Sequence, residues 1–216
     1  MKRCAMLCLA LGLGAILAGG CNYLGYFGYL VAPEEPAKTI QAEFKDLPGK
    51  TLAVVVFAEP KLLYDYPFVR DEISGAVGDQ LTRNVEHLKA VSPRQIVRYQ
   101  QENPEWDSEG RTALGKALQC DYVLHISVVE FSTLEQGSEY LHRGRITAQA
   151  TLYKTSLPEA SACAWRGNEV RLAYPENEPV GQVVEDDRAL RIETIRRFAD
   201  LLAKKFYKHE IKEAAK

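Results

Sequence analysis

Residues 50–58 limit the fold most, because they form an almost unbroken apolar run rich in valine. Such a run is typical of a strand that is buried on both faces of its sheet. A strand of this kind needs other elements packed above and below it, as in layered α/β proteins. The chain has 216 residues and is 46% hydrophobic, which is enough apolar material for such a core and excludes a wholly disordered chain.

The rest of the chain alternates between helical and strand-like patterns. Apolar residues recur at helical spacing in residues 67–88 and 188–208, which predicts two amphipathic helices. Ser92 and the proline after it mark the start of a third helix, and Ser108 is predicted to cap a fourth over residues 109–118. Strands are predicted at residues 89–92, 120–131, 140–155 and, as one long strand or a strand pair, 160–173.

This order of elements predicts an α/β (α+β) fold, with a mixed sheet in two or three layers, flanking helices and an amphipathic helix near the carboxyl end. Gly75 and Gly78 lie inside the first long helix, where each costs about 1 kcal/mol relative to alanine. We interpret them as points of close contact between the helix and the sheet. A phosphate-binding loop is the alternative, but no lysine or GxGxxG pattern follows a strand there.

The first twenty residues have the features of a signal peptide. Lys2 and Arg3 precede an uncharged apolar run that is short for a membrane span. Small residues then lead to a cysteine, and the whole segment resembles a bacterial lipoprotein signal. The lipobox residues are Leu17, Ala18, Gly19, Gly20 and Cys21. The resemblance implies cleavage before Cys21, a diacylglycerol thioether on its sulfur and an acyl chain on its amine; the alternative is an ordinary secretory signal.

Several acyl chains would anchor the protein stably without a spanning helix, and this lipid on Cys21 is the only cofactor-like group that we expect. Asn22, directly after the cysteine, resembles the outer-membrane case of the enterobacterial sorting rule. We therefore expect a protein anchored in a cell membrane, the outer membrane in particular, on its periplasmic side. The predicted organisation is a signal peptide at residues 1–20, a lipidated tether at 21–48, one domain at 49–210 and a tail at 211–216.

The tether begins with an aromatic stretch. Its aromatic residues are Tyr23, Tyr26, Phe27 and Tyr29. Tyrosine rings favour the interface of a bilayer, where the ring is apolar and the hydroxyl group stays hydrated. One interpretation places this stretch against the lipid headgroups beside the anchor. The other has it packed on the protein's own domain.

Four segments carry a second resemblance. They are the run at residues 52–57, Asp79-Gln80-Leu81-Thr82, residues 92–96, and a Leu-Gly pair ahead of Asp121-Tyr122-Val123-Leu124. Together they are similar to the TolB N-terminal-like lipoproteins, over residues 50–208. That group includes the curli secretion channel lipoprotein and the outer-membrane activator of penicillin-binding proteins. The resemblance implies a periplasmic interaction domain that is not an enzyme.

Two departures keep the known functions of that group from being carried over. The connections after residues 131 and 155 are too short for transmembrane hairpins, whose strands need about 9–11 residues each. The tether is also short compared with one that crosses the periplasm. The first hypothesis is therefore an anchored interaction, assembly or regulatory module of an envelope complex with a protein partner. The second is a homo-oligomeric ring component of a secretion or transport apparatus.

Evidence for chemistry in the sequence is sparse. No HExxH, CxxC, GxxxxGK or GxSxG motif is present, so a hydrolase of envelope polymers is the weakest hypothesis and no metal site is expected. The net charge of −2 means that basic residues are not in excess, as they normally are in a protein that binds nucleic acid. His125 is interpreted as a hydrogen-bonded core histidine rather than a ligand or base. The cluster from Glu185 to Asp187 is interpreted as favouring a helix start rather than binding calcium.

Three residues are candidates for partner contact: Trp106, Arg143 and Arg145. Trp106 is either an interface residue or the anchor of its loop on the core. The two arginines, with others on neighbouring strands, form either a partner-binding patch or a salt-bridged sheet surface. Cys120 and Cys163 begin strands that another strand separates by about 9–10 Å, too far for a disulfide, which predicts two unpaired buried thiols.

Overall fold

The structure is a computed structural model that describes residues 38–178, 180–184 and 186–211. Ile40–His209 form one compact unit. The described residues outside this unit belong to two short strands, β1 (Lys38–Ile40) and β8 (His209–Ile211), which pair with each other.

The compact unit is built on a mixed sheet with the strand order β3-β2-β4-β5-β6. β2 (Thr51–Ala58) pairs in parallel with β3 (Lys89–Ala90) and with β4 (Tyr122–Leu134). β4 then pairs antiparallel with β5 (His142–Lys154). The predicted mixed α/β fold is confirmed, and the valine-rich run forms a central strand, as its burial pattern requires.

The two strands that follow β5 both pair with it and not with each other. β7 (Val170–Tyr174) pairs with residues 144–148 of β5, and β6 (Cys163–Arg166) pairs with residues 151–153. Two short strands therefore form in this region, rather than one long strand. The simple meander that the sequence suggested does not form, because β5 is long enough to accept two short partners along the same edge.

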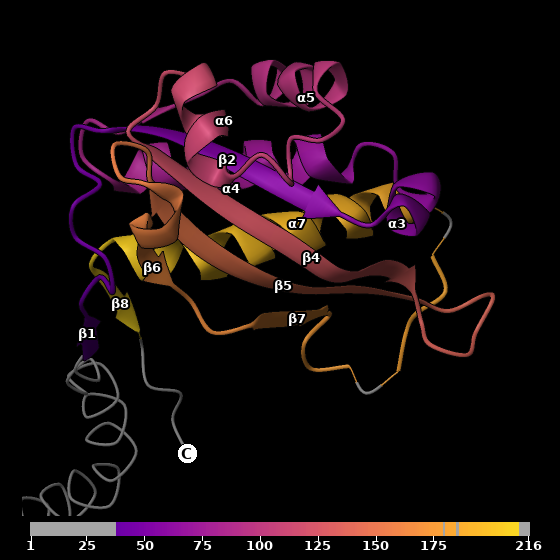
Figure 1. Cartoon of the computed structure of the whole chain (residues 1–216). Helices are drawn as coiled ribbons and strands as arrows, with labels where there is room; N and C mark the ends of the chain where they lie inside the picture. The colour runs from indigo at the N-terminus through magenta and orange to yellow at the C-terminus, as the bar shows by residue number, and fades with distance from the viewer. Residues whose placement is uncertain (1–37, 179, 185, 212–216) are drawn as a thin grey trace, which may run out of the picture. The chain divides into compact units, whose positions relative to one another are not determined.

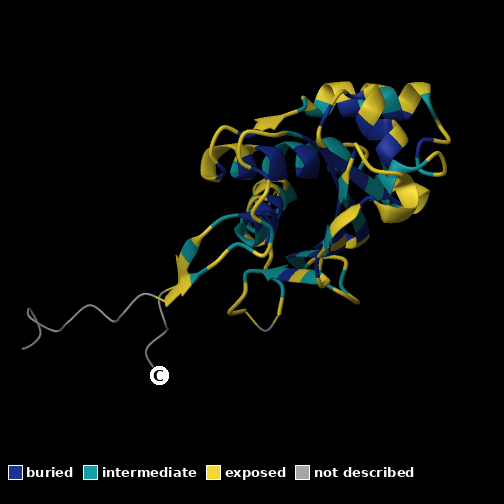
Figure 2. Ribbon diagram, turned by 60° about the vertical axis from the view of Figure 1, so that its left-hand side comes forward, coloured by how far each residue is buried: buried dark blue, intermediate teal, exposed yellow. Residues whose placement is uncertain are grey.

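Helices cover the two faces of the sheet unequally. α4 (Val69–Asn84) and α7 (Asp187–Ala203) pack on one face and bury the larger core, which includes Phe198. α5 (Pro93–Glu102) and α6 (Arg111–Ala117) pack on the other face, over β2 and β4. Figure 2 shows the buried residues concentrated where these helices meet the sheet. The fold has three layers over β2 and β4 and two layers over β5 and β7.

Some element boundaries differ from those predicted. α3 (Pro60–Asp65) was not expected, and α4 ends earlier because the backbone becomes extended at Val85. α6 begins after Gly110 and not after Ser108, whose hydroxyl group donates to the carbonyl of Glu105 instead. α7 ends at Ala203 and is followed by a single 3₁₀ turn, Lys204–Phe206.

The predicted close contact at Gly75 and Gly78 is wrong. A Cβ atom at Gly75 would lie 3.7 Å from its nearest neighbour, and one at Gly78 would lie 3.6 Å from its own. Both are ordinary van der Waals distances. Among the described glycines, the one with the least space for a Cβ atom is instead Gly144 on β5. A Cβ atom at Gly144 would overlap the hydroxyl group of the fully buried Thr194 on α7.

Candidate interaction surfaces

The predicted anchor lies outside the described residues. This applies to the lipobox and to the aromatic stretch of the tether, that is, to Leu17, Ala18, Gly19, Gly20, Cys21, Tyr23, Tyr26, Phe27 and Tyr29. Within the described ranges, no helix is both long and apolar enough to cross a bilayer.

One half of a sheet face is left uncovered by helices. α5 and α6 pack against Ala53, Val55 and Val123, which lie on β2 and β4. On the same face, β5, β6 and β7 carry polar side chains that are exposed or half-buried: Arg145, Thr147, Gln149, Arg166 and Arg171. Val129 on the neighbouring strand is 66% exposed. We call these residues of β5, β6 and β7 the open half-face.

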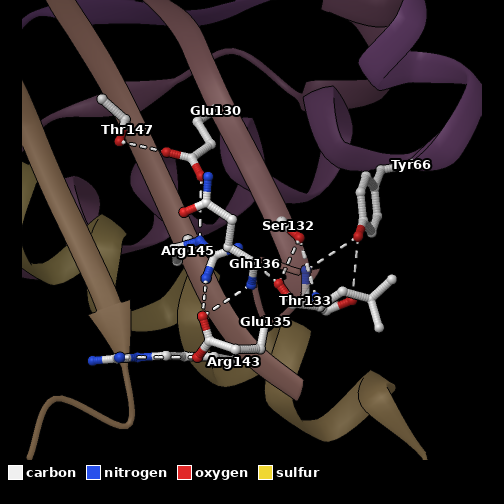
Figure 3. A network of polar contacts seen from close by, with 10 residues as sticks. Tyr66, Glu130, Ser132, Thr133, Glu135, Gln136, Arg143, Arg145 and Thr147 are labelled. Carbon is white, nitrogen blue, oxygen red and sulfur yellow. Dashed lines mark hydrogen bonds and ion pairs between the residues drawn. The ribbon is translucent and has the colours of Figure 1, made fainter. Parts of the chain in front are cut away.

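Arg145 holds together the end of the β4–β5 hairpin, as Figure 3 shows. Its Nη1 lies 2.7 Å from Oε1 of Glu135 and its Nε lies 3.2 Å from Oε1 of Glu130. Nη2 also donates to the carbonyl of Leu134 at 2.8 Å. The planar guanidinium group thus bonds three acceptors at once, which a lysine could not do with the same geometry.

Arg143 approaches the same carboxylate, with its Nη1 3.9 Å from Oε2 of Glu135. The side chains of Arg143 and Arg145 are only 18% and 21% exposed. The backbone N–H of Gln136 contributes most to lowering the pKa of Glu135, and Arg145 and Arg143 add to it. Of the two interpretations of this region, the salt-bridged sheet surface fits these contacts better than a free basic patch.

The network continues to the helices through Thr133. The Thr133 hydroxyl group donates to Oδ2 of Asp187 at 2.6 Å, and its backbone N–H donates to the hydroxyl group of Tyr66 at 3.1 Å. Asp186 is the N-cap of α7, where its side chain accepts from the N–H of Arg188. These two acidic residues therefore serve the start of α7, as predicted; Glu185 is outside the described residues.

Trp106 is buried and cannot offer its ring to a partner in this structure. The residue is 5% exposed and packs in the core under α5 and α6. Its ring lies 6.3 Å from that of Phe57 and 6.2 Å from that of His125, measured between centroids. Of the two interpretations, the one in which Trp106 anchors its loop is the one that the geometry supports.

His125 is packed as expected but is poorly bonded. Its Nε2 lies 3.5 Å from Oδ1 of Asp107, beyond the usual length of a hydrogen bond. Asp107 is engaged by Arg111, whose Nη2 lies 2.7 Å from the same oxygen. Burial is the main cause that lowers the pKa of His125 to about 4, and the charge of Arg111 acts in the same direction. The imidazole ring is therefore neutral at pH 7.

The cysteines are unpaired, but only one of them is buried. Cys120 is 5% exposed, and burial raises the pKa of its thiol to about 11. Cys163 is exposed at the start of β6, so its predicted burial is wrong. The reason is that β6 is an edge strand of the sheet and no helix covers this residue.

Sequence reasoning missed several surface grooves, because each is formed by residues far apart in the chain. One lies between α4 and α7, with carboxylates and arginines around an apolar floor. A second, of about 260 Å³, lies where β4 begins and β5 ends, and three lysines line it. Over the described ranges, no group of three or more His, Cys, Asp and Glu side chains could hold a metal ion.

No family model and no curated protein matches the chain. Its structure is similar to the PelC dodecamer from Paraburkholderia phytofirmans, with a TM-score of 0.42 and 11% identity over 78% of this chain and 96% of that one. Lipoprotein GNA1162 from Neisseria meningitidis aligns with a TM-score of 0.38 and 14% identity, over 60% of this chain and 87% of that one. A minor lipoprotein from Acinetobacter baumannii gives 0.34 and 12%, over 72% and 87%. Likeness at this level does not by itself identify a function.

Proposed function

We propose that this protein is a lipid-anchored component of the bacterial cell envelope that acts as an interaction or assembly module and catalyses no reaction. The observation that carries the proposal is the leader, in which Lys2 and Arg3, an apolar run and the lipobox ending at Cys21 follow in the required order. The acylated cysteine would anchor the protein in the outer membrane, as Asn22 favours, with the compact unit in the periplasm.

The open half-face supports the interaction role. It presents Gln149, Arg166 and Arg171 on a rigid sheet, with the exposed Val129 beside them. A rigid, mixed polar and apolar surface of this kind suits a protein partner. The resemblance to TolB N-terminal-like lipoproteins agrees with this role.

The arrangement of the buried ionisable groups favours packing over catalysis. His125, whose pKa is lowered mainly by burial, packs between Trp106 and Phe57. Its neighbour Asp107 is occupied by Arg111. These groups lie where the connection between α5 and α6 packs on β4, and we assign them no reaction.

Metabolic labelling with palmitate tests the anchor. Cells that produce the full chain should incorporate the label, and the Cys21→Ala variant should lose both the label and retention in the membrane pellet. A Cys163→Ala variant is the control, because it removes an exposed thiol that the proposal does not use. An unlabelled wild-type protein would overturn the proposal.

Photo-crosslinking in intact cells tests the interaction role. A photoreactive amino acid at Gln149, on the open half-face, should capture a discrete envelope protein. The same group at Glu102, exposed at the end of α5, should capture much less. Capture only of the protein itself, together with a large cyclic oligomer in light scattering, would favour the ring component instead.

A further inference from the structure

Lysine side chains gather at one end of the compact unit. This is the end where the parallel strands β2, β3 and β4 begin and where β5 ends (Figure 1). Lys50 precedes β2, Lys89 begins β3, Lys154 ends β5, and Lys116 lies in the last turn of α6. We call these four residues the lysine rim.

The strand register brings the rim together. The N–H of Lys89 donates to the carbonyl oxygen of Lys50 at 2.9 Å, so these residues are neighbours across β2 and β3. Lys154 pairs with Tyr122, the first residue of β4. Lys50, Lys116 and Lys154 line the same groove of about 260 Å³.

The rim carries a local excess of positive charge. All four lysines are exposed, and among the residues that the structure describes none of them has an ion-pair partner within 4.0 Å. The one carboxylate in the groove, Asp121, offsets only one of these positive charges. Its Oδ2 accepts from the N–H of Thr51 at 2.8 Å and from the Thr51 hydroxyl group at 2.9 Å.

The chain that leads in from the amino-terminal side runs along this same end. The ring of Phe44 packs edge-on against that of Tyr122, with 5.7 Å between centroids. Leu47 is fully buried, and its carbonyl oxygen accepts from the N–H of Lys50 at 3.1 Å. From Ile40, where the compact unit begins, the chain therefore passes Tyr122 at Phe44 and arrives at the rim at Lys50.

We propose that the lysine rim binds the phosphate groups of anionic phospholipids in the bilayer that holds the acylated Cys21. This rests on the proposed function and adds an orientation, with the amino ends of β2 and β4 toward the membrane. Lysine suits such a surface, because its ammonium group has rotatable donors and needs no fixed bidentate geometry. The attraction acts within about 10 Å of the surface, so it needs the tether to bring the unit close.

Vesicle flotation tests the proposal without any acyl group. The chain from residue 22 onward keeps every described residue, and the compact unit within it has its own cores. We expect it to float with vesicles that contain phosphatidylglycerol, but not with phosphatidylcholine alone. High salt should abolish the binding. Equal binding to neutral vesicles, or no binding to anionic ones at low salt, would overturn the proposal.

A charge-matched pair of variants locates the site. The triple variant Lys50→Gln, Lys116→Gln, Lys154→Gln should bind anionic vesicles about a hundredfold more weakly, since each lysine near such a surface contributes about fivefold. The control removes three positive charges elsewhere: Lys61→Gln, Arg94→Gln and Arg98→Gln. It should retain most of the affinity, and both variants should unfold in urea as the parent does.

The remaining outcomes are also decisive. Equal weakening by the two triple variants would show an effect of net charge alone and would contradict the proposal. Binding to soluble polyglutamate without any binding to anionic vesicles would identify an acidic protein ligand instead and would contradict it too. Because the assay contains no lipidated cysteine, it is independent of the palmitate experiment that tests the anchor.

Discussion

His125 Nε2 and Asp107 Oδ1 are 3.5 Å apart, a separation that leaves the histidine close to a carboxylate without a good hydrogen bond. Burial lowers the pKa of His125 to about 4, from an ordinary value of 6.5, and Arg111 adds to this effect. The attraction of Asp107 acts in the opposite direction and does not offset it. The folded protein therefore binds this proton more weakly than the unfolded chain does.

The protein should lose stability as the pH falls from about 6.5 toward 4. In this range the unfolded chain takes up a proton that the folded protein resists, so the free energy of unfolding rises with pH. The contribution of His125 is present in full above pH 6.5, and about 3 kcal/mol of it is lost by pH 4. Urea unfolding at a series of pH values measures it.

A pair of histidine variants separates this effect from general acid unfolding. His125→Asn should flatten the pH dependence between 4 and 6.5, whatever its effect at pH 7. His87→Asn should leave the dependence unchanged, because the side chain of His87 is 83% exposed. An unchanged slope in His125→Asn would show that other groups cause the acid sensitivity.

Gly144→Ala should destabilise the fold strongly. The new Cβ atom would overlap the hydroxyl group of Thr194, which is fully buried on α7, and overpacking of this kind costs about 1–3 kcal/mol. Gly78→Ala is the matched comparison and should be neutral or stabilising by up to about 1 kcal/mol, since its Cβ atom has room inside a helix. Thermal unfolding of both variants, and partial rescue of Gly144→Ala by Thr194→Ala, would check the stated cause.

Arg145→Ala should lower the melting temperature by about 3 °C or more, because it removes three polar contacts that hold the end of the β4–β5 hairpin. Arg171→Ala breaks an ion pair on the same open half-face. The side chain of Arg171 is 77% exposed, so we expect little change. Equal melting temperatures for the two variants would mean that the network around Arg145 contributes no more than a surface pair.

The two thiols should react at very different rates with a maleimide at pH 8. Cys163 is exposed and should be labelled quickly in the folded protein. Cys120 should react only after unfolding, because burial shields its sulfur and raises its pKa to about 11. Mass spectrometry under non-reducing conditions should find no link between them. Rapid labelling of Cys120 would show that the packing of α6 on β4 opens readily.

Elements with strong local patterns could be predicted from the sequence. The valine-rich run became β2, and the helical spacing of Ile195, Phe198 and Leu202 became the buried side of α7. Ile192, in the same spacing, is 53% exposed, because it lies at the edge of the groove between α4 and α7. Periodicity identifies a stripe of residues, but the neighbouring helix decides how wide the buried stripe is.

The candidate contacts depended more on the tertiary structure. The pattern around Trp106 was compatible with exposure, and the packing of α5 and α6 over β2 buried it. The start of α6 also depends on the tertiary structure. The carboxylate of Glu159, distant in sequence, accepts from the backbone N–H groups of Arg111 and Thr112 at 2.9 and 2.8 Å. No local pattern could have identified this cap.

The sequence alone predicted the leader, the lipobox ahead of the tether, the alternation of strands and helices, and the class of fold, because these depend on neighbouring residues and on periods of two to four positions. Only the tertiary structure decided which charges meet. Strand register and helix packing bring Lys50, Lys116 and Lys154 to one groove, and they place Arg145 between Glu130 and Glu135. A surface is formed by residues that are distant in the chain, so their spacing in the sequence does not predict that they lie together.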